Sequence, residues 1–178
     1  MRKLFLLATV FITSFAFAQE FVLTPDGYKD KSSDKNFYVF EVAGKSQSEL
    51  FTKAKVFITA TYKGLKNDGY NEVAPEQMVM DVNGNKEFMA LINLSGANVW
   101  KVNNRYEINF KDGRVMIKPT FSYLDNAVDI GTKADISTLF KKNGEARRPK
   151  AVEQIQIETN EFVSGLENAL KSTASDDW

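Results

Sequence analysis

Side chains that commonly perform catalysis are scarce in this sequence, which contains no histidine and no cysteine. A serine–histidine or cysteine–histidine nucleophile is therefore impossible, and so is a zinc site built from the usual nitrogen and sulfur ligands. The remaining acid–base candidates are the carboxylates of Glu41, Asp81 and Glu107, which lie on predicted strands. Two carboxylates must converge in a cleft to act together, as in glycosidases. We interpret these three as solvated sheet positions and predict no catalytic residue.

Two charged segments raise the possibility of an ion site. Acidic residues occur at 26, 30 and 34 in DGYKDKSSD, but this segment lacks the alternating oxygen ligands and central glycine of a calcium loop. The basic cluster RRPK at 147–150 could attract an anion, because Pro149 begins a predicted helix with a positive N-terminus. We interpret the cluster as a solvated loop. The sequence therefore predicts no metal and no cofactor.

Aromatic residues offer a different possibility, a pocket for a small ligand. Phe37, Tyr38, Phe40 and Trp100 lie on predicted strands. Aromatic side chains on strands more often belong to the core than to a pocket, and we interpret these four as core.

The first eighteen residues, MRKLFLLATVFITSFAFA, have the pattern of a secretory signal peptide. Arg2 and Lys3 precede an apolar run too short to span a bilayer comfortably, and the small residues Ala16 and Ala18 suit signal peptidase. A retained membrane anchor is the alternative, whereas a lipoprotein is excluded because no cysteine follows the run. We expect an exported product that begins at Gln19, is periplasmic or extracellular, and does not span a membrane.

Length and charge limit the number of domains and the kind of partner expected for the exported chain. Removing 18 residues from 178 leaves 160, which suits a single domain, residues 19–178, with its own core. The same removal takes two of the 23 basic residues and none of the 23 acidic ones, so the formal net charge becomes −2. Because a nearly neutral chain lacks the basic surface of nucleic-acid binders, we expect no nucleic-acid partner.

The predicted elements begin after a polar N-terminal extension, residues 19–36, which is typical of turns and loops. Residues 37–42, FYVFEV, are apolar on both faces over most of their length, which predicts a central strand. Ser46 and Glu49 then have the spacing of a capping box at a helix start. The apolar stripe of this helix is Leu50, Ala54, Phe57, Ile58 and Thr61, and Gly64 is expected to end it as a left-handed cap.

From Gln77 onward the spacing of apolar residues changes from the helical pattern to every second residue, as in a strand. MVMDV and EFMALINL flank Asn83-Gly84, and RYEINF and RVMIKPTFSY flank Asp112-Gly113. Both dipeptides favour two-residue turns, so the pattern predicts two hairpins. The connection at 94–103 between them has room for a short strand around Trp100.

The C-terminal part is less regular. Residues 124–150 form a long polar connection with one short helical candidate at 134–140. Pro149 opens the last helix at a tolerated first-turn position, and residues 172–178 are expected to fray. The apolar stripe of this helix is Val152, Ile155, Thr159, Phe162, Val163, Leu166 and Leu170.

The second hairpin predicts two faces of opposite character. A two-residue turn at Asp112-Gly113 places Ile108 opposite Ile117 and Glu107 opposite Lys118. The core face is then Tyr106, Ile108, Phe110, Val115, Ile117 and Phe121. The other face, a candidate interaction face, is Arg105, Glu107, Asn109, Met116, Lys118 and Thr120. Pro119 cannot donate to a ladder, which indicates an edge or a bulge at that point.

The predicted elements are, in order, a strand, a capped helix, four strands in two hairpins and a second helix. Together with the signal peptide and the pattern FYVFEVAGKSQSELFTKAKVFI, this order resembles a known family. This is a family of exported domains of unknown function from the Bacteroides group with a TATA-binding-protein-like (TBP-like) fold. The resemblance covers residues 37–123, and residues 124–150 depart from it. It implies an α+β fold, β-α-β(4)-α, in which two helices pack on one face of a curved antiparallel sheet. It supplies no functional residues, and the fold name implies no DNA binding.

These observations favour a non-catalytic binding or interaction module of the bacterial cell envelope. Its partner would be an unknown envelope protein or a small ligand, bound at the open sheet face or at a sheet edge. The first alternative is a small-ligand carrier with a pocket between sheet and helices, and the second is an enzyme of unrecognised type.

Overall fold

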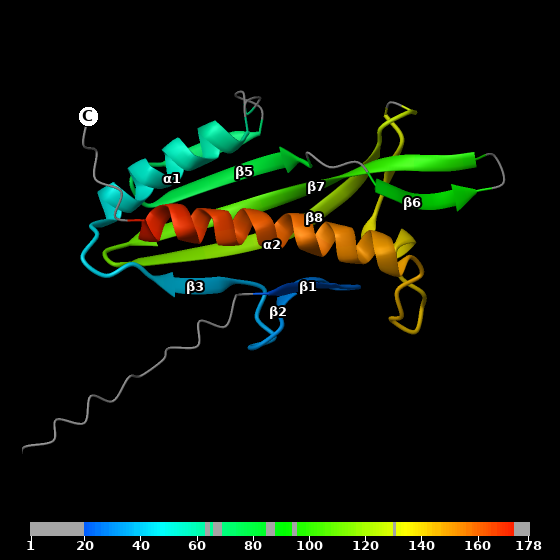
Figure 1. The fold of residues 1–178 in the computed structure, drawn as a ribbon, viewed down its shortest axis with the longest axis horizontal. Helices are drawn as coiled ribbons and strands as arrows, with labels where there is room; N and C mark the ends of the chain where they lie inside the picture. Colours follow the sequence, from blue (N-terminus) through cyan, green and yellow to red (C-terminus); the bar gives the residue numbers. More distant parts are fainter. Residues whose placement is uncertain are drawn as a thin grey trace, which may run out of the picture.

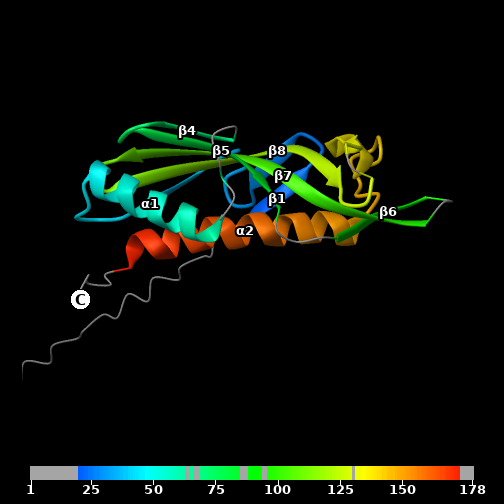
Figure 2. The same ribbon diagram turned by 90° about the horizontal axis from the view of Figure 1, so that it is seen from above.

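The computed structural model describes residues 20–62, 65, 69–84, 88–93, 96–129 and 131–172, with backbone alone for 88–93 and 96–98. The predicted signal peptide, the expected start at Gln19, Gly64 and all but the first residue of the 172–178 tail lie outside these residues. A curved antiparallel sheet forms one layer, and two helices form a second layer on one of its faces (Figures 1 and 2). This arrangement confirms the predicted α+β fold class.

The chain forms more strands than the sequence predicted. They are β1 (Phe21–Thr24), β2 (Gly27–Asp30), β3 (Tyr38–Glu41), α1 (Gln47–Thr61), β4 (Tyr70–Val73), β5 (Gln77–Asn83), β6 (Phe88–Asn93), β7 (Gly96–Lys111), β8 (Arg114–Asn126), β9 (Lys133–Ala134), the 3-10 helix η1 (Ile136–Thr138) and α2 (Pro149–Lys171). The main sheet has the order β3-β8-β7-β5-β4, with β6 also paired to β7 and β9 to β8. Within the helical candidate at 134–140 the only helix is the 3-10 helix η1, while Ala134 ends β9, so the α-helix considered there does not form.

The second predicted hairpin is confirmed in full. β7 and β8 pair so that Lys111 is opposite Arg114, Ile108 opposite Ile117, and Glu107 opposite Lys118. The register shifts once, between Asn103 and Asn104, because β8 carries an extra residue there. The predicted core residues of this hairpin are buried except Phe121, which is half-buried.

The first predicted hairpin is wrong. β5 pairs with β4 and β7, and β6 pairs with β7, so the segments on either side of Asn83-Gly84 are not partners. The N–H of Gly84 instead donates to the carbonyl of Val102 at 2.6 Å. A Cβ at position 84 would lie 2.8 Å from that oxygen. The glycine therefore permits close approach of two backbones rather than a two-residue turn.

Two further expectations for the N-terminal half are corrected. The strand predicted at 37–42 is β3, which pairs with β8 alone and so lies at an edge of the sheet rather than in its centre. The polar extension at 19–36 contains the β1–β2 hairpin. Phe21 of β1 is fully buried, and the side-chain amide of Asn160 on α2 bonds its N–H and its carbonyl at 2.8 and 3.0 Å.

Both helices begin at the predicted positions, α1 after the Ser46 cap and α2 at Pro149. The Ser46 hydroxyl accepts from the N–H of Glu49, and the Glu49 carboxylate accepts from the N–H of Ser46, which completes the capping box and lowers the Glu49 pKa. On α1 the buried residues are Leu50, Phe51, Ala54 and Ile58, whereas Thr61 is exposed against expectation. Every residue of the predicted α2 stripe is buried.

Candidate functional site

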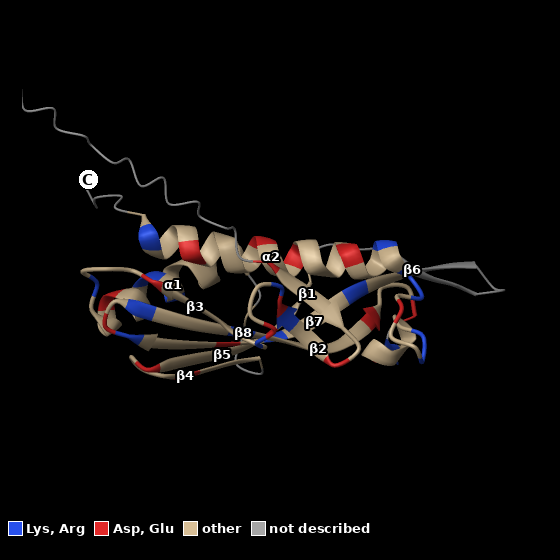
Figure 3. Cartoon of the chain, turned by 90° about the horizontal axis from the view of Figure 1, so that it is seen from below, with Lys and Arg blue, Asp and Glu red and all other residues tan. Residues whose placement is uncertain are grey.

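The sheet face away from the helices carries the predicted interaction residues. Acidic and basic residues of this face form ion pairs across strands. Figure 3 shows acidic and basic residues interspersed along the chain rather than separated into two regions. Arg105 binds Asp81 through two contacts of 2.8 and 2.7 Å. Lys118 lies 3.0 Å from Glu107, and Arg114 lies 3.0 Å from Glu41. Exposed pairs of this kind stabilise the fold by at most about 1 kcal/mol each, so their main effect is to set the pattern of charge on the face.

The three candidate carboxylates do not form an acid–base pair. Glu41, Asp81 and Glu107 each bind a basic residue on a neighbouring strand, and the register places these pairs in different rows of the sheet. No cleft brings two of them together among the described residues. Their interpretation as solvated sheet positions agrees with this geometry.

A hollow of about 370 Å³ lies on the same face near the β7–β8 turn. Val39, Met116 and Asn109 form one row across β3, β8 and β7, and Lys111 and Arg114 lie in the next row. Val39 is 39% exposed, so the floor is apolar while the rim is basic. Sequence reasoning included Asn109 and Met116 but missed Val39, because its place beside Met116 depends on the non-local pairing of β3 with β8.

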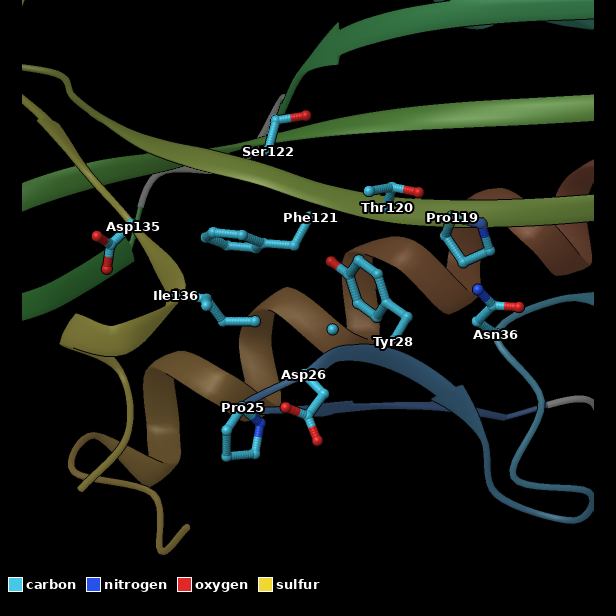
Figure 4. Close-up of a pocket in the computed structure, with 11 residues that line it drawn as sticks. Pro25, Asp26, Tyr28, Asn36, Pro119, Thr120, Phe121, Ser122, Asp135 and Ile136 are labelled. Atoms are coloured by element: carbon cyan, nitrogen blue, oxygen red, sulfur yellow. The ribbon is translucent and has the colours of Figure 1, made fainter. Parts of the chain in front are cut away.

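A second hollow, of about 290 Å³, lies at the outer edge of β8 (Figure 4). The pairing of β3 with β8 stops at Ile117, and the pairing of β9 with β8 starts at Leu124. The hollow occupies the interval between them. Its lining comprises Pro25, Asp26, Gly27, Tyr28, Asn36, Pro119, Thr120, Phe121, Ser122, Asp135 and Ile136. Sequence reasoning identified Pro119 as an edge or bulge position, and the rest of this site depends on the unpredicted β1–β2 hairpin.

A cluster of buried polar side chains joins the N-terminal hairpin to the sheet and to α2. The Thr159 hydroxyl donates to the Tyr28 hydroxyl at 2.8 Å, which donates to the Asn104 amide oxygen at 3.0 Å. The Asn104 amide nitrogen donates to Thr159 at 3.1 Å and to the Tyr106 hydroxyl at 3.4 Å. Burial raises the pKa of Tyr28 well above its ordinary value and that of Tyr106 to about 12. Both phenols are therefore neutral at physiological pH, and the cluster has a structural role.

The remaining candidates are structural as well. Phe40 and Trp100 are buried, and Tyr38 is half-buried against the core, as predicted. The core interpretation is wrong for Phe37, which is half-buried outside the core with Lys35 over its ring. The Asp30 carboxylate accepts hydrogen bonds from Ser32 and Ser33 within its own turn. Across the described residues, no group of three or more acidic side chains is arranged to hold a metal ion.

The basic cluster at the start of α2 has no capping role through its side chains. Arg148 is the N-cap of α2 but forms no side-chain capping bond. Within the described part of the chain, neither helix has both the length and the apolar character needed to cross a membrane.

The chain is similar to two solved bacterial structures. One is a DUF4468 family protein from Bacteroides ovatus, with 11% identity, a TM-score of 0.51, and coverage of 78% of this chain and 86% of that one. The other is a TBP-like protein from Parabacteroides distasonis, with 15% identity, a TM-score of 0.51, and coverage of 76% and 91%. No family model and no curated protein matches the chain. At these identities the likeness concerns the fold, and it confirms the TBP-like architecture implied by the sequence resemblance.

Proposed function

We propose that the protein is an exported, non-catalytic interaction module of the bacterial cell envelope, which binds a partner protein through the open face of its sheet. The observation that carries this proposal is a sheet face that no element covers in the described part of the chain (Figure 2). Both helices pack on the opposite side (Figure 2). The open face combines ion pairs with the apolar floor at Val39 and Met116. A shallow face of mixed polarity suits contact with another protein.

The chemistry of the chain supports a non-catalytic role. Histidine and cysteine are absent from the sequence, and the candidate carboxylates are separated and paired with bases. The two similar structures carry no enzymatic name. The carrier alternative has less support, because both hollows described above lie outside the helix–sheet interface. In that interface Leu50, Ile108 and Ile155 are fully buried.

Export rests on the pattern of residues 1–18 and is tested separately. The protein is expressed in a Bacteroides host, recovered from the periplasm or medium, and its intact mass is measured. The expected mass is that of a chain beginning at Gln19, with or without cyclisation of that glutamine. A mass that retains residues 1–18 would contradict export by cleavage.

The interaction is tested by reversing one ion pair on the open face. The double variant Glu107→Lys with Lys118→Glu keeps the pair and the net charge but inverts the local charge pattern. Capture of partners from an envelope fraction should fall strongly relative to the parent protein. The matched control is Lys141→Glu with Glu145→Lys. This exposed pair lies between η1 and α2, outside the strands of the open face, and its reversal should leave capture intact. Equal capture by all three proteins would contradict the proposal.

A further inference from the structure

The outer edge of β8 has backbone groups without a strand partner. The N–H of Phe110 donates to Glu76 at 2.9 Å, so the backbone groups of Phe110, Ile108 and Tyr106 on β7 face β5. In an antiparallel ladder their partners on β8 must then turn their N–H and C=O groups away from β7. These partners are Val115, Ile117 and Pro119.

Pro119 explains why β3 pairs no further along this edge. Ile117 is paired with Tyr38, so one more step would bring Asn36 opposite Pro119. Proline has no N–H to donate, and the ladder stops there. Successive residues of β8 turn their backbone groups alternately toward β7 and outward, so the N–H and C=O of Phe121 also face outward. The outer edge of β8 is paired again only at Leu124, with β9. Among the described residues no strand pairs with this edge between Ile117 and Leu124.

The hollow in front of this edge has an apolar wall and an acidic rim. Figure 4 shows Phe121, Ile136 and Pro119 around it, with Asp26 and Asp135 also in the lining. No lysine or arginine lines it. The Asp135 carboxylate also caps η1 by accepting from Ser137, and that bond holds the Asp135 pKa below its usual range. Asp26 is exposed, and its carboxylate has no hydrogen-bond partner among the described residues.

We propose that this edge is a peptide-binding slot, in which an extended segment of a partner pairs with Phe121 and places a lysine or arginine side chain in the hollow. The outward N–H and C=O of Phe121, which have no strand partner among the described residues, supply the two backbone bonds that strand addition requires. The aliphatic stem of the basic side chain covers Phe121 and Ile136, and its charged end lies near Asp26. A volume of about 290 Å³ is at the lower limit for small-ligand pockets, which suits one side chain.

This slot is independent of the open-face function. The segment would be short, since the free edge comprises residues 118–123 and is closed by β3 at one end and β9 at the other. Reversal of the Asp81–Arg105 pair, whose residues lie on β5 and β7 of the open face, should therefore leave peptide binding unchanged.

The test uses three synthetic peptides and the full-length chain. The first is acetyl-Val-Thr-Lys-Thr-Val-amide, the second replaces its lysine by norleucine, and the third methylates the backbone nitrogen of the lysine. Binding is followed by calorimetry at low salt and by the NMR shift of the Phe121 amide. The lysine peptide should shift that amide saturably and bind about tenfold more tightly than the norleucine peptide. The methylated peptide should bind at least about tenfold more weakly than its parent, because it cannot donate to the strand edge.

Variants of the protein complete the test. Asp26→Asn should reduce the affinity for the lysine peptide to that for the norleucine peptide, whereas Glu153→Gln, at an exposed acid on α2, should have no effect. Equal binding of the lysine and norleucine peptides would overturn the basic side-chain pocket. Undiminished binding of the methylated peptide, or no saturable shift at millimolar peptide, would overturn the slot itself. The peptide comparisons need no variant, so they decide the matter even if Asp26→Asn perturbs the fold.

Discussion

Asn104 shows, at the scale of single residues, what local patterns cannot predict. Its amide bonds side chains from β2, β7 and α2, at positions 28, 106 and 159. Residues so far apart in the sequence show no shared periodicity, so the polar cluster could not be predicted without the fold. By contrast, the alternation along residues 105–118 was sufficient to assign each of those side chains to a face, because strand side chains alternate with a period of two.

The buried phenol of Tyr106 predicts a loss of stability at alkaline pH. Its pKa is raised to about 12 by burial, from an ordinary value of 10. Below pH 10 the phenol is protonated in both states, and between pH 10 and about 12 only the unfolded state releases the proton, which favours unfolding. The free energy of unfolding should fall by about 1.4 kcal/mol per pH unit from this group. Urea denaturation from pH 9 to 11.5 should show a shallower decline in Tyr106→Phe than in the parent. The same decline in both proteins would contradict this origin.

The two faces of the β7–β8 hairpin predict unequal costs of substitution. Ile108 is fully buried, so Ile108→Ala should reduce the free energy of unfolding by about 2–5 kcal/mol through lost contacts and a residual cavity. Lys118 is partly exposed and its pair with Glu107 is solvated, so Lys118→Ala should cost at most about 1 kcal/mol. Chemical denaturation measures both values. Similar costs for the two substitutions would refute the face assignment.

At the scale of elements, prediction succeeded where the signal is local. The capping box, the α2 stripe and the turn at Asp112-Gly113 each involve residues within a few positions of one another. It failed where pairing is non-local, since the apolar alternation of β5 is the same whether its neighbour is β6 or β7. Asn83-Gly84 was misleading because the dipeptide reads the same whether its glycine forms a two-residue turn or allows close approach to the backbone of Val102.

The capping box of α1 predicts a measurable contribution to helix stability. Ser46→Ala removes the acceptor for the N–H of Glu49, and the expected loss is about 0.5–2 kcal/mol. The matched control is Ser164→Ala on the exposed side of α2, where alanine should be neutral or slightly stabilising because of its higher helix propensity. Thermal and urea unfolding of the two variants provide the comparison. A cost for Ser164→Ala as large as that for Ser46→Ala would show that the cap itself is not responsible.

At the scale of the whole molecule, the candidate sites depend on which strands are neighbours. The polar face of β7 and β8 was predictable, but the hollow at Val39 required β3 to lie beside β8. The slot at Phe121 required three separate features, namely the end of β3, the start of β9 and the β1–β2 hairpin. Sites formed by distant segments therefore follow from the topology rather than from any single motif.

The N-terminal hairpin is predicted to be an integral part of the domain rather than an extension. Phe21, Leu23 and Tyr28 are 0%, 4% and 2% exposed, and burial of such side chains stabilises a fold by about 1.5–3 kcal/mol each. Together they contribute about 5–9 kcal/mol, which is comparable to the total stability of an ordinary domain, about 5–15 kcal/mol. A chain beginning at Lys31 would also leave the polar groups of Asn104 and Thr159 without their Tyr28 partner.

This truncated chain should therefore lose its sharp, cooperative unfolding transition and the dispersion of its amide NMR spectrum. Tyr28→Phe in the full chain is the control, because it keeps the ring and removes one hydroxyl. It should retain cooperative unfolding with a loss of about 1–3 kcal/mol. If the truncated chain unfolds cooperatively at the same urea midpoint as the parent, the hairpin is dispensable, and the slot at the edge of β8 would then be bordered by a segment that the fold does not need.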